Sequence, residues 1–358
     1  MKIKSLQIVN FKSHNDLDLN FTEKLICFSG ENGAGKTNLL DAIHYVCLAK
    51  SFLNNIDSQN INFDSEFFMI NGTIEKNDKL ESIKCSLKRK SKKKLQRNNK
   101  EYEKIADHIG LFPTVVISPY DSNLIAEGSE TRRKFLDSII SQYDKQYLYH
   151  LIEYNKVLKQ RNSLLKKFKD DRFFDVELLD IWTYPLIDLG KKINEKRVVF
   201  VNEFNQMFNS YYEKISNKKE ASTLTLKTNI EGDLGKLYKE TIEKDKALTY
   251  TNIGIHKDDL EFLIDNKNIK KYGSQGQQKS YLIALKLAQY FFLKEKTNTE
   301  PILLLDDIFD KLDKNRVSNL LELAMSDEIG QIFITHTESE RLEEVLNQKN
   351  FPFQMFKL

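Results

Sequence analysis

The octapeptide Gly30–Thr37, GENGAGKT, constrains the fold of this chain more than any other feature. It has the G-x4-G-K-T pattern, in which glycines let the backbone wrap phosphate groups and a helix N-terminus faces their negative oxygens. The apolar run at 25–28 before it predicts a buried strand, and Leu39, Ile43 and Val46 after it recur at helical spacing. The order strand, glycine-rich turn, helix predicts a nucleotide site in an α/β domain.

The chemistry of the pattern assigns a role to each position. We expect Lys36 to reach the β- and γ-phosphates of ATP and the Thr37 hydroxyl to bind Mg²⁺. A glycine-rich turn with a purely structural role is the alternative, and the predicted strand and helix on either side argue against it. The predicted ATP-binding residues are Gly30, Glu31, Asn32, Gly33, Ala34, Gly35, Lys36, Thr37 and Asn38.

A second motif, LLLDD at 303–307, ends another apolar run in two aspartates. A carboxylate at the end of a buried strand can hold Mg²⁺ opposite a phosphate loop, and Asp306 fits that role together with Thr37. Asp307 is then placed to orient or deprotonate the attacking water. Adjacent aspartates can also simply cap a strand. The phosphate loop elsewhere in the chain favours the metal site.

A third motif, Ser274, Gln275, Gly276 and Gln277, opens a predicted helix 32 residues before Asp306. Small residues and free amides at a helix N-terminus form an anion site. One chain seldom needs two such sites, so we expect this one to meet the γ-phosphate bound by a second copy, in an ATP-dependent homodimer. As an isolated pattern it is more often an ordinary helix start.

The arrangement of predicted elements suggests three segments. Residues 1–120 hold three strands over 2–28, the phosphate loop and a basic hairpin; 121–215 form a helical arm; and 216–358 return to strands. We expect one long amphipathic helix from Leu136 to Leu158 and a second over 176–214 that Pro185 kinks or splits. The first and last segments would then build one α/β head around an inserted arm.

Charge and cysteine usage limit the partners and the compartment. The chain holds 55 Lys and Arg against 52 Asp and Glu, a net charge of +3, so any basic surface must be local. The candidates for DNA contact are Lys50, Lys88, Arg89, Lys93, Lys94, Arg97, Arg132 and Arg133. An exposed hairpin without a ligand explains the 84–100 stretch equally well. Three cysteines without a CxxC pair and no long apolar run predict a cytoplasmic protein without a membrane partner.

Together these motifs resemble the ATP-binding-cassette ATPase heads, and most closely the RecF family within the SMC-like group. The similarity runs through QIVNFKSHNDLDLNF, GENGAGKTNLLDAIHYVCLAKSF, SQGQQKS and LLLDDIFDKLD. It implies a D-loop role for Asp313 and a catalytic switch role for His336. Where the family pattern has G-P-H-R-D-D, this chain has GIHKDD at 254–259, with Lys257 in place of an arginine.

The resemblance also implies a function. It points to an ATP-dependent protein of recombinational repair that binds double-stranded and gapped DNA and acts with RecR and RecO. Asp307 stands where many members of the class have glutamate, which predicts slow hydrolysis and a switch that ATP turnover resets. The competing hypothesis is a motor subunit that acts on a protein partner without DNA, and a third is a scaffold with a relic nucleotide site.

Overall fold

The computed structural model describes residues 1–358 except 217–219, 231, 308–327, 338–342, 344–345 and 347–350. It divides into two compact units, one of Met1–Asp121 with Lys286–Leu358 and one of Ser122–Leu285. The first and last parts of the chain thus fold together, as predicted. The predicted boundary at 215/216 is different in the structure, because residues 220–285 pack with the helical unit.

The first unit contains a five-stranded parallel sheet. Its order is β14-β3-β13-β12-β8, and every neighbouring pair is parallel. The strands are β3 (Leu25–Ser29), β8 (Thr114–Ile117), β12 (Ile302–Leu305), β13 (Ile332–His336) and β14 (Phe353–Lys357). All residues of β3, β12 and β13 are buried, which is why they are continuous apolar runs. The predicted strands before the phosphate loop and before Asp306 are confirmed.

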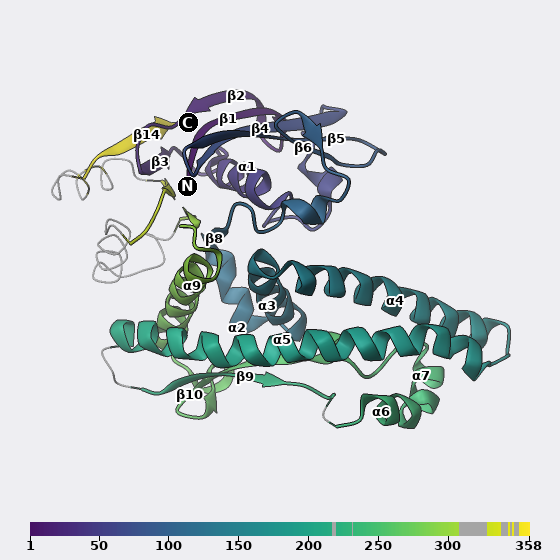
Figure 1. The fold of residues 1–358 in the computed structure, drawn as a ribbon. Helices are drawn as coiled ribbons and strands as arrows, with labels where there is room; N and C mark the ends of the chain where they lie inside the picture. Colours follow the sequence, from purple (N-terminus) through teal and green to yellow (C-terminus); the bar gives the residue numbers. More distant parts are fainter. Residues whose placement is uncertain (217–219, 231, 308–327, 338–342, 344–345, 347–350) are drawn as a thin grey trace. The chain divides into compact units, whose positions relative to one another are not determined.

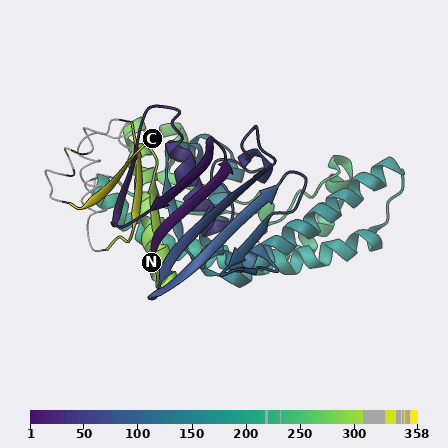
Figure 2. The same ribbon diagram turned by 90° about the horizontal axis from the view of Figure 1, so that it is seen from above.

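A six-stranded antiparallel sheet, ordered β2-β1-β4-β5-β6-β7, forms the second layer of this unit (Figure 2). Its strands are β1 (Lys2–Phe11), β2 (His14–Asn20), β4 (Phe67–Lys76), β5 (Lys79–Lys88), β6 (Lys94–Arg97) and β7 (Lys100–Glu101). Asn98 and Asn99 both have positive φ, as a tight turn between β6 and β7 requires. Helix α1 (Lys36–Leu48) contacts strands of both sheets and shares one core with them.

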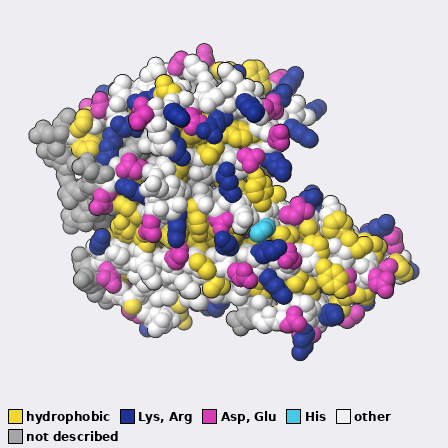
Figure 3. All heavy atoms as spheres, viewed as in Figure 1, with side chains coloured by type: hydrophobic (Ala, Val, Ile, Leu, Met, Phe, Trp, Pro, Cys, Tyr) yellow, Lys and Arg dark blue, Asp and Glu magenta, His cyan; other side chains and the backbone are white. Residues whose placement is uncertain are grey.

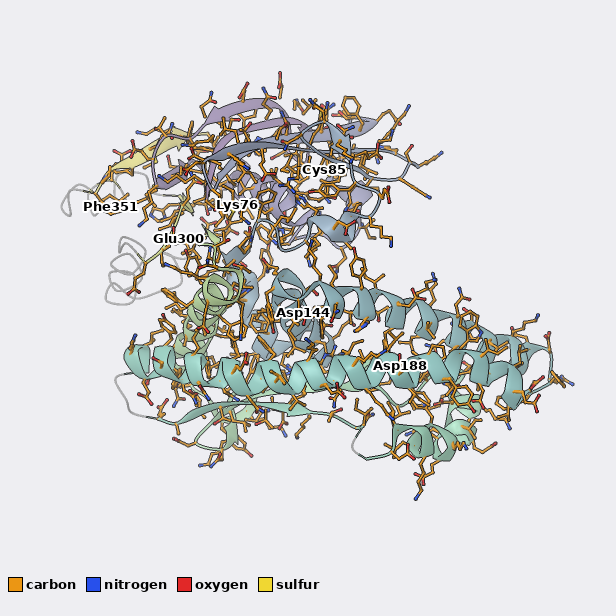
Figure 4. The ribbon with its side chains drawn as sticks, in the orientation of Figure 1. Lys76, Cys85, Asp144, Asp188, Glu300 and Phe351 are labelled. Atoms are coloured by element: carbon orange, nitrogen blue, oxygen red, sulfur yellow. The ribbon has the colours of Figure 1, made fainter. Side chains whose placement is uncertain are left out.

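The helical unit begins with α2 (Asn123–Ala126), α3 (Ser129–Tyr143), α4 (Lys145–Asp170) and α5 (Val176–Ser216), and α4 lies along α5 (Figure 1). The predicted single helix over 136–158 is wrong, since the chain breaks at Asp144 (Figure 4), whose carboxylate accepts a hydrogen bond from the Tyr147 amide and caps α4. The predicted split at Pro185 is also wrong, because α5 runs through it.

The remaining residues of this unit complete it around α5. They form β9 (Ser222–Lys227), α6 (Leu234–Glu240), α7 (Ile242–Leu248), β10 (Asp259–Ile264), β11 (Lys267–Asn268), α8 (Ile269–Tyr272) and the start of α9 (Gln275–Thr297). The sheet order is β11-β10-β9. Asn205 of α5 donates a hydrogen bond to the Leu224 carbonyl at 2.6 Å, and the rings of Phe208 and Tyr281 lie 4.6 Å apart. These contacts join β9 and α9 to α5, and β10 follows because it pairs with β9 and contacts α3.

The predicted return to strands after residue 216 is confirmed for β9 and β10, with helices between and after them. Residues 255–257 form a short 3-10 turn, and only Asp259–Ile264 pair in a sheet. In the described part of the chain, no helix combines the length and apolarity needed to cross a membrane.

Candidate nucleotide-binding site

Three strand ends meet at one edge of the parallel sheet. The phosphate loop follows β3, Asp306 follows β12, and His336 ends β13, the strand between them. His336 pairs in register with Ser29, the last residue before the loop. Ligands of open parallel sheets bind at this carboxyl edge. The topology therefore brings together three motifs that are far apart in the sequence.

The phosphate loop leaves the N-terminus of α1 without a side-chain cap. The N-cap residue is Gly35 in the left-handed region, with φ of 95°, and a Cβ there would lie 2.6 Å from the Ser13 hydroxyl oxygen. Only glycine fits this position. The helix amides of α1 therefore stay available for an anion.

Lys36 is held against the same loop. Only 4% of it is exposed, and its ammonium donates hydrogen bonds of 3.0 Å to the carbonyls of Gly30 and Glu31. A positive charge fixed over the loop backbone adds to the helix dipole in favouring phosphate.

Asp306 sits in a network of hydroxyl groups. Its Oδ1 accepts hydrogen bonds from the Thr37 hydroxyl at 2.8 Å and from the Thr335 hydroxyl at 2.9 Å. The Thr335 hydroxyl in turn accepts a hydrogen bond of 2.9 Å from the Asp307 amide. One threonine thus positions both aspartates. Thr37 and Asp306, both predicted as magnesium ligands, are 269 residues apart in the chain and are joined by a hydrogen bond.

The environment of Asp306 leaves its charge only partly compensated. Burial raises the pKa of this carboxyl, the Thr37 and Thr335 hydrogen bonds lower it, neighbouring Asp307 raises it and Lys36 lowers it. A buried carboxylate beside a hydroxyl offers hard oxygen ligands of the kind that Mg²⁺ prefers. The residues present therefore fit a magnesium ion bound with a nucleotide, which would neutralise the Asp306 carboxylate.

Asp307 and His336 complete this edge. Asp307 has a left-handed backbone, with φ of 41°, which turns the chain sharply after β12. His336 is buried, with 1% of it exposed, at the end of the central strand. Asp313, the predicted D-loop residue, lies outside the described residues.

Three residues of the site were not predicted. Besides Thr335, the turn after β1 brings His14 to the loop, where its Nε2 lies 3.1 Å from the Gly35 carbonyl oxygen. Burial lowers the pKa of His14, and its contact with Gly35 raises it. Ser13 accepts a hydrogen bond of 2.8 Å from the predicted ligand Asn38. The available signal was the polar pair Lys12 and Ser13 between β1 and β2, followed by His14 at the start of β2.

The signature motif lies in the other unit, at the start of α9. The Ser274 hydroxyl accepts a hydrogen bond from the Gln277 amide at 3.2 Å, and the Gln277 side chain accepts one from the Ser274 amide at 2.6 Å. This reciprocal pair is a capping box. Gln277 also donates to Glu220 at 2.6 Å. Ser274 and Gln275 are exposed, with Gly276 partly so, and the motif is preorganised at the surface of its unit.

Several predicted DNA-contacting cations are already engaged within the chain. Lys93 pairs with Asp57 at 2.8 Å, Arg97 pairs with Glu81, and Arg132 pairs with Asp259. Arg89 donates to the Ser65 and Asn62 carbonyls, and Arg133 donates to Ser129 and to the Asp258 carbonyl. These groups have less to offer a phosphate than unpaired cations.

Other basic side chains are presented to solvent. Lys88 is exposed at the end of β5, Lys94 at the start of β6, and Lys50 after α1. Figure 3 shows lysines and arginines gathered over the sheet region that contains β5 and β6. Among the predicted DNA-contacting cations, Lys50, Lys88 and Lys94 are exposed, whereas Arg132 and Arg133 of α3 are only partly exposed.

Comparison with known proteins agrees with this architecture. A family model described as "RecF/RecN/SMC N terminal domain" matches residues 2–355. A curated protein of Flavobacterium johnsoniae, named DNA replication and repair protein RecF, is 49% identical over 359 residues, covering 100% of both chains. A namesake from Bacteroides fragilis is 47% identical and covers 100% of this chain and 96% of its own.

The chain belongs to the RecF family. A solved structure of the recombination mediator protein RecF-ATPrS in the RecFOR pathway has a TM-score of 0.89, at 29% identity, and covers 100% of this chain and 96% of its own. The RecF-ATP structure of the same pathway has a TM-score of 0.88, at 31% identity over 94% and 92% of the two chains. An SmcHead structure, with a TM-score of 0.54 at 16% identity over 94% and 90%, shares the fold alone.

Family membership identifies the phosphate loop and the Asp306 edge as parts of an SMC-like ATPase head. The predicted fold class, an α/β ATPase head with an inserted helical arm, is confirmed. The curated relatives of this chain are named DNA replication and repair proteins.

Proposed function

We propose that this chain is an ATP-dependent DNA-binding protein of recombinational repair, in which ATP acts as a switch. The observation that carries the proposal is the network linking the phosphate loop to the metal-site carboxylate, Thr37 to Asp306 to Thr335. Two relatives of this fold were solved as RecF-ATPrS and RecF-ATP. The Thr37 hydroxyl, the Asp306 carboxylate and the Lys36 ammonium are groups of the kind that bind MgATP.

Within the site, each residue has a separate task. The free amides of α1 and the Lys36 ammonium bind the phosphates, and Thr37 with Asp306 would hold Mg²⁺. The metal would neutralise phosphate charge. Asp307, fixed through the Thr335 hydroxyl, orients the attacking water, and His336 acts at the γ-phosphate end. The short Asp307 side chain makes hydrolysis slow.

The signature segment supplies the second half of the switch. Ser274, Gln275 and Gly276 are presented at the N-terminus of α9, where amides and the helix dipole favour an anion. We assign this surface to the γ-phosphate held by a second copy. ATP then stabilises the dimer, and hydrolysis releases it, because only the triphosphate spans both halves of the composite site.

The dimer would hold double-stranded and gapped DNA through exposed lysines such as Lys88 and Lys94. Phosphate contacts of this kind position a duplex without selecting its sequence. RecR and RecO would be the protein partners in recombinase loading, as the RecFOR pathway of the two solved relatives suggests.

The test titrates duplex, gapped and single-stranded DNA against the full chain with ATP, ADP and no nucleotide, at two salt concentrations. We expect duplex-containing DNA to bind tighter with ATP and weaker at high salt. The double variant Lys88→Gln, Lys94→Gln should weaken binding and flatten the salt dependence, whereas Lys134→Gln, which removes an exposed cation paired with Glu130, serves as the matched control. Absence of any ATP-linked, salt-sensitive DNA binding would favour the motor hypothesis instead.

A further inference from the structure

Glu220 joins the end of helix α5 to the signature motif. It lies just before β9 and is partly buried. Its Oε2 accepts a hydrogen bond of 2.7 Å from the Tyr212 hydroxyl, and its Oε1 accepts one of 2.6 Å from the Gln277 side-chain amide. One carboxylate therefore connects α5 with the first turn of α9. No motif of the sequence pointed to this residue.

The partners of Gln277 fix the orientation of its side-chain amide. The Ser274 backbone amide can only donate, so it must meet Gln277 Oε1, which lies 2.6 Å away. The Glu220 carboxylate can only accept, so it must meet Gln277 Nε2. Turning the amide over would set donor against donor and acceptor against acceptor. Glu220 therefore selects the orientation in which Gln277 accepts from Ser274.

This orientation determines which donors the signature presents. The Ser274 hydroxyl oxygen accepts a hydrogen bond of 3.2 Å from the Gln277 amide, and a hydroxyl that accepts keeps its own proton to donate. The first amides of a helix have no acceptor within it, and the cap uses only that of Gln277. The amides of Gln275 and Gly276 and the hydroxyl of Ser274 thus stay available for an anion.

Glu220 is itself held in place by its surroundings. The Ala221 amide donates to the Asp265 carboxylate at 3.0 Å, and the Asp265 amide donates to the Ala221 carbonyl at 2.8 Å. Tyr212 is buried, and its ring lies 5.7 Å from that of Tyr281 of α9. Burial and the hydrogen bond to Glu220 raise the pKa of the Tyr212 hydroxyl, which therefore remains a donor at neutral pH. The fold positions the carboxylate without help from a ligand.

The charge of Glu220 opposes the binding of an anion at the signature. Like charges repel, so a carboxylate beside this helix start weakens phosphate binding by its charge alone. Hydrogen bonds to an ionised acceptor are stronger than those to a neutral one, and two oxygens serve Tyr212 and Gln277 at once. The advantage of a carboxylate here is therefore the position it gives to Gln277.

We propose that Glu220 is a positioning residue for the composite ATP site. It holds Gln277 so that the free donors of the signature face the γ-phosphate of ATP bound by a second copy. The inference rests on the proposed ATP switch and deepens it, because the signature has this task only in the dimer. Glu220 acts through Gln277 and contacts neither nucleotide nor metal.

The test compares variants of the full chain by sedimentation in MgATP. Glu220→Ala removes both hydrogen bonds and should weaken the dimer at least about tenfold, the equivalent of one hydrogen bond to a charged group. Glu220→Gln offers an oxygen to Gln277 and an amide to the Tyr212 oxygen, so its dimer should be as tight as the native one. Glu261→Ala removes a carboxylate that pairs with Lys227 at 2.6 Å on the same unit, and this matched control should keep native affinity.

Two further measurements separate positioning from general damage. Hydrogen exchange of the peptide 272–280 without nucleotide should be faster in Glu220→Ala alone, since the amides of the capping box lose protection. Binding of ATP to the monomer should be unchanged in every variant, because the phosphate loop belongs to the other unit. Urea unfolding checks that each variant folds, and Glu220→Met, which has no carboxylate, replaces an unstable alanine variant.

The outcomes distinguish this inference from the switch on which it rests. A native dimer in MgATP together with native affinity in Glu220→Ala, an equal loss in Glu220→Gln, or unchanged exchange would overturn the positioning role. Charge repulsion alone predicts that both Glu220 variants dimerise more tightly than the native chain, and that result would also overturn it. A native chain that stays monomeric in MgATP would refute the switch itself.

Discussion

Two buried charges, one in each unit, have opposite environments. In the helical unit, Arg197 is 1% exposed and donates to Asp258 and to the Ile255 carbonyl at 2.7 Å each, and to Asp137 at 2.8 Å. In the other unit, Asp306 is 2% exposed and is met by hydroxyl groups. Arg197 is hydrogen-bonded to two carboxylates, whereas among the described residues the side chains hydrogen-bonded to Asp306 are hydroxyl groups, and Lys36 acts on it through space.

The pKa shifts show the same contrast. Burial lowers the pKa of Arg197, but Tyr147, Asp137 and Asp258 outweigh it and raise the pKa overall. For Asp306, burial dominates and raises the pKa of a group whose charged form a metal would need. A fully paired buried charge maintains structure, and a partly compensated one marks the place for a ligand.

The largest expected effect comes from breaking the paired cluster. Arg197→Met leaves Asp258 and Asp137 without their partner, so the free energy of unfolding should fall by about 3–5 kcal/mol. Urea unfolding measures this, and Lys134→Met, from an exposed pair, should change stability by less than about 1 kcal/mol. Equal losses of stability in the two variants would contradict the claim that the buried Arg197 cluster maintains the structure.

An intermediate effect is expected for Thr335→Val, which keeps the shape but removes the hydroxyl between the two aspartates. The free energy of unfolding should fall by about 1–3 kcal/mol, since the Asp307 amide loses its acceptor. ATP turnover should fall at least tenfold, with a smaller change in ATP affinity. Thr335→Ser, which restores the hydroxyl, should recover most of the turnover. A variant with full turnover would remove Thr335 from the site.

The smallest effect has the opposite sign. Asp306→Asn should raise the free energy of unfolding without nucleotide or Mg²⁺, on the order of 1 kcal/mol, because it removes a buried charge and keeps an acceptor for both hydroxyls. Turnover should be lost. A destabilised variant would show that Asp306 is as well compensated as Asp258.

The pH dependence follows from the raised pKa of Asp306. Below the ordinary pKa of 3.8 the carboxyl is protonated in both the folded and the unfolded chain. In that range the native protein and Asp306→Asn should have equal free energies of unfolding. As pH rises through the raised folded pKa, the native protein must hold the charge and its stability falls relative to the variant. A stability advantage of Asp306→Asn that shrinks as pH rises would contradict this prediction.

Much of the head was predictable because the residue patterns of its motifs determine the local backbone structure. The strand before Gly30, the helix after Lys36 and the strand before Asp306 follow from uninterrupted apolar runs and glycine spacing. The chemistry of their motifs predicted that Thr37 and Asp306 lie near one another, as ligands of one magnesium ion. Thr335 was not predicted, because a threonine inside a buried strand has no pattern that separates it from packing residues.

The arm was predicted less well, because its structure depends on interactions that apolar periodicity does not reveal. The break at Asp144 depends on a cap that can form only once the helix direction changes, although helical spacing continues across it. Pro185 lies on the exposed side of α5, where the missing hydrogen bond can be made to water, so the helix continues. The assignment of β9 and β10 to the arm depends on contacts with α5 that a linear pattern does not show.

The central claim is that one copy's phosphate loop and another copy's signature helix enclose the same ATP. Mixing two inactive variants tests it most directly. Lys36→Ala keeps Ser274, and Ser274→Arg keeps the loop. We expect each alone to sediment as a monomer in MgATP without turnover, and the mixture to form dimers with partial turnover, since one composite site is restored. A mixture as inactive and monomeric as its components would contradict the account.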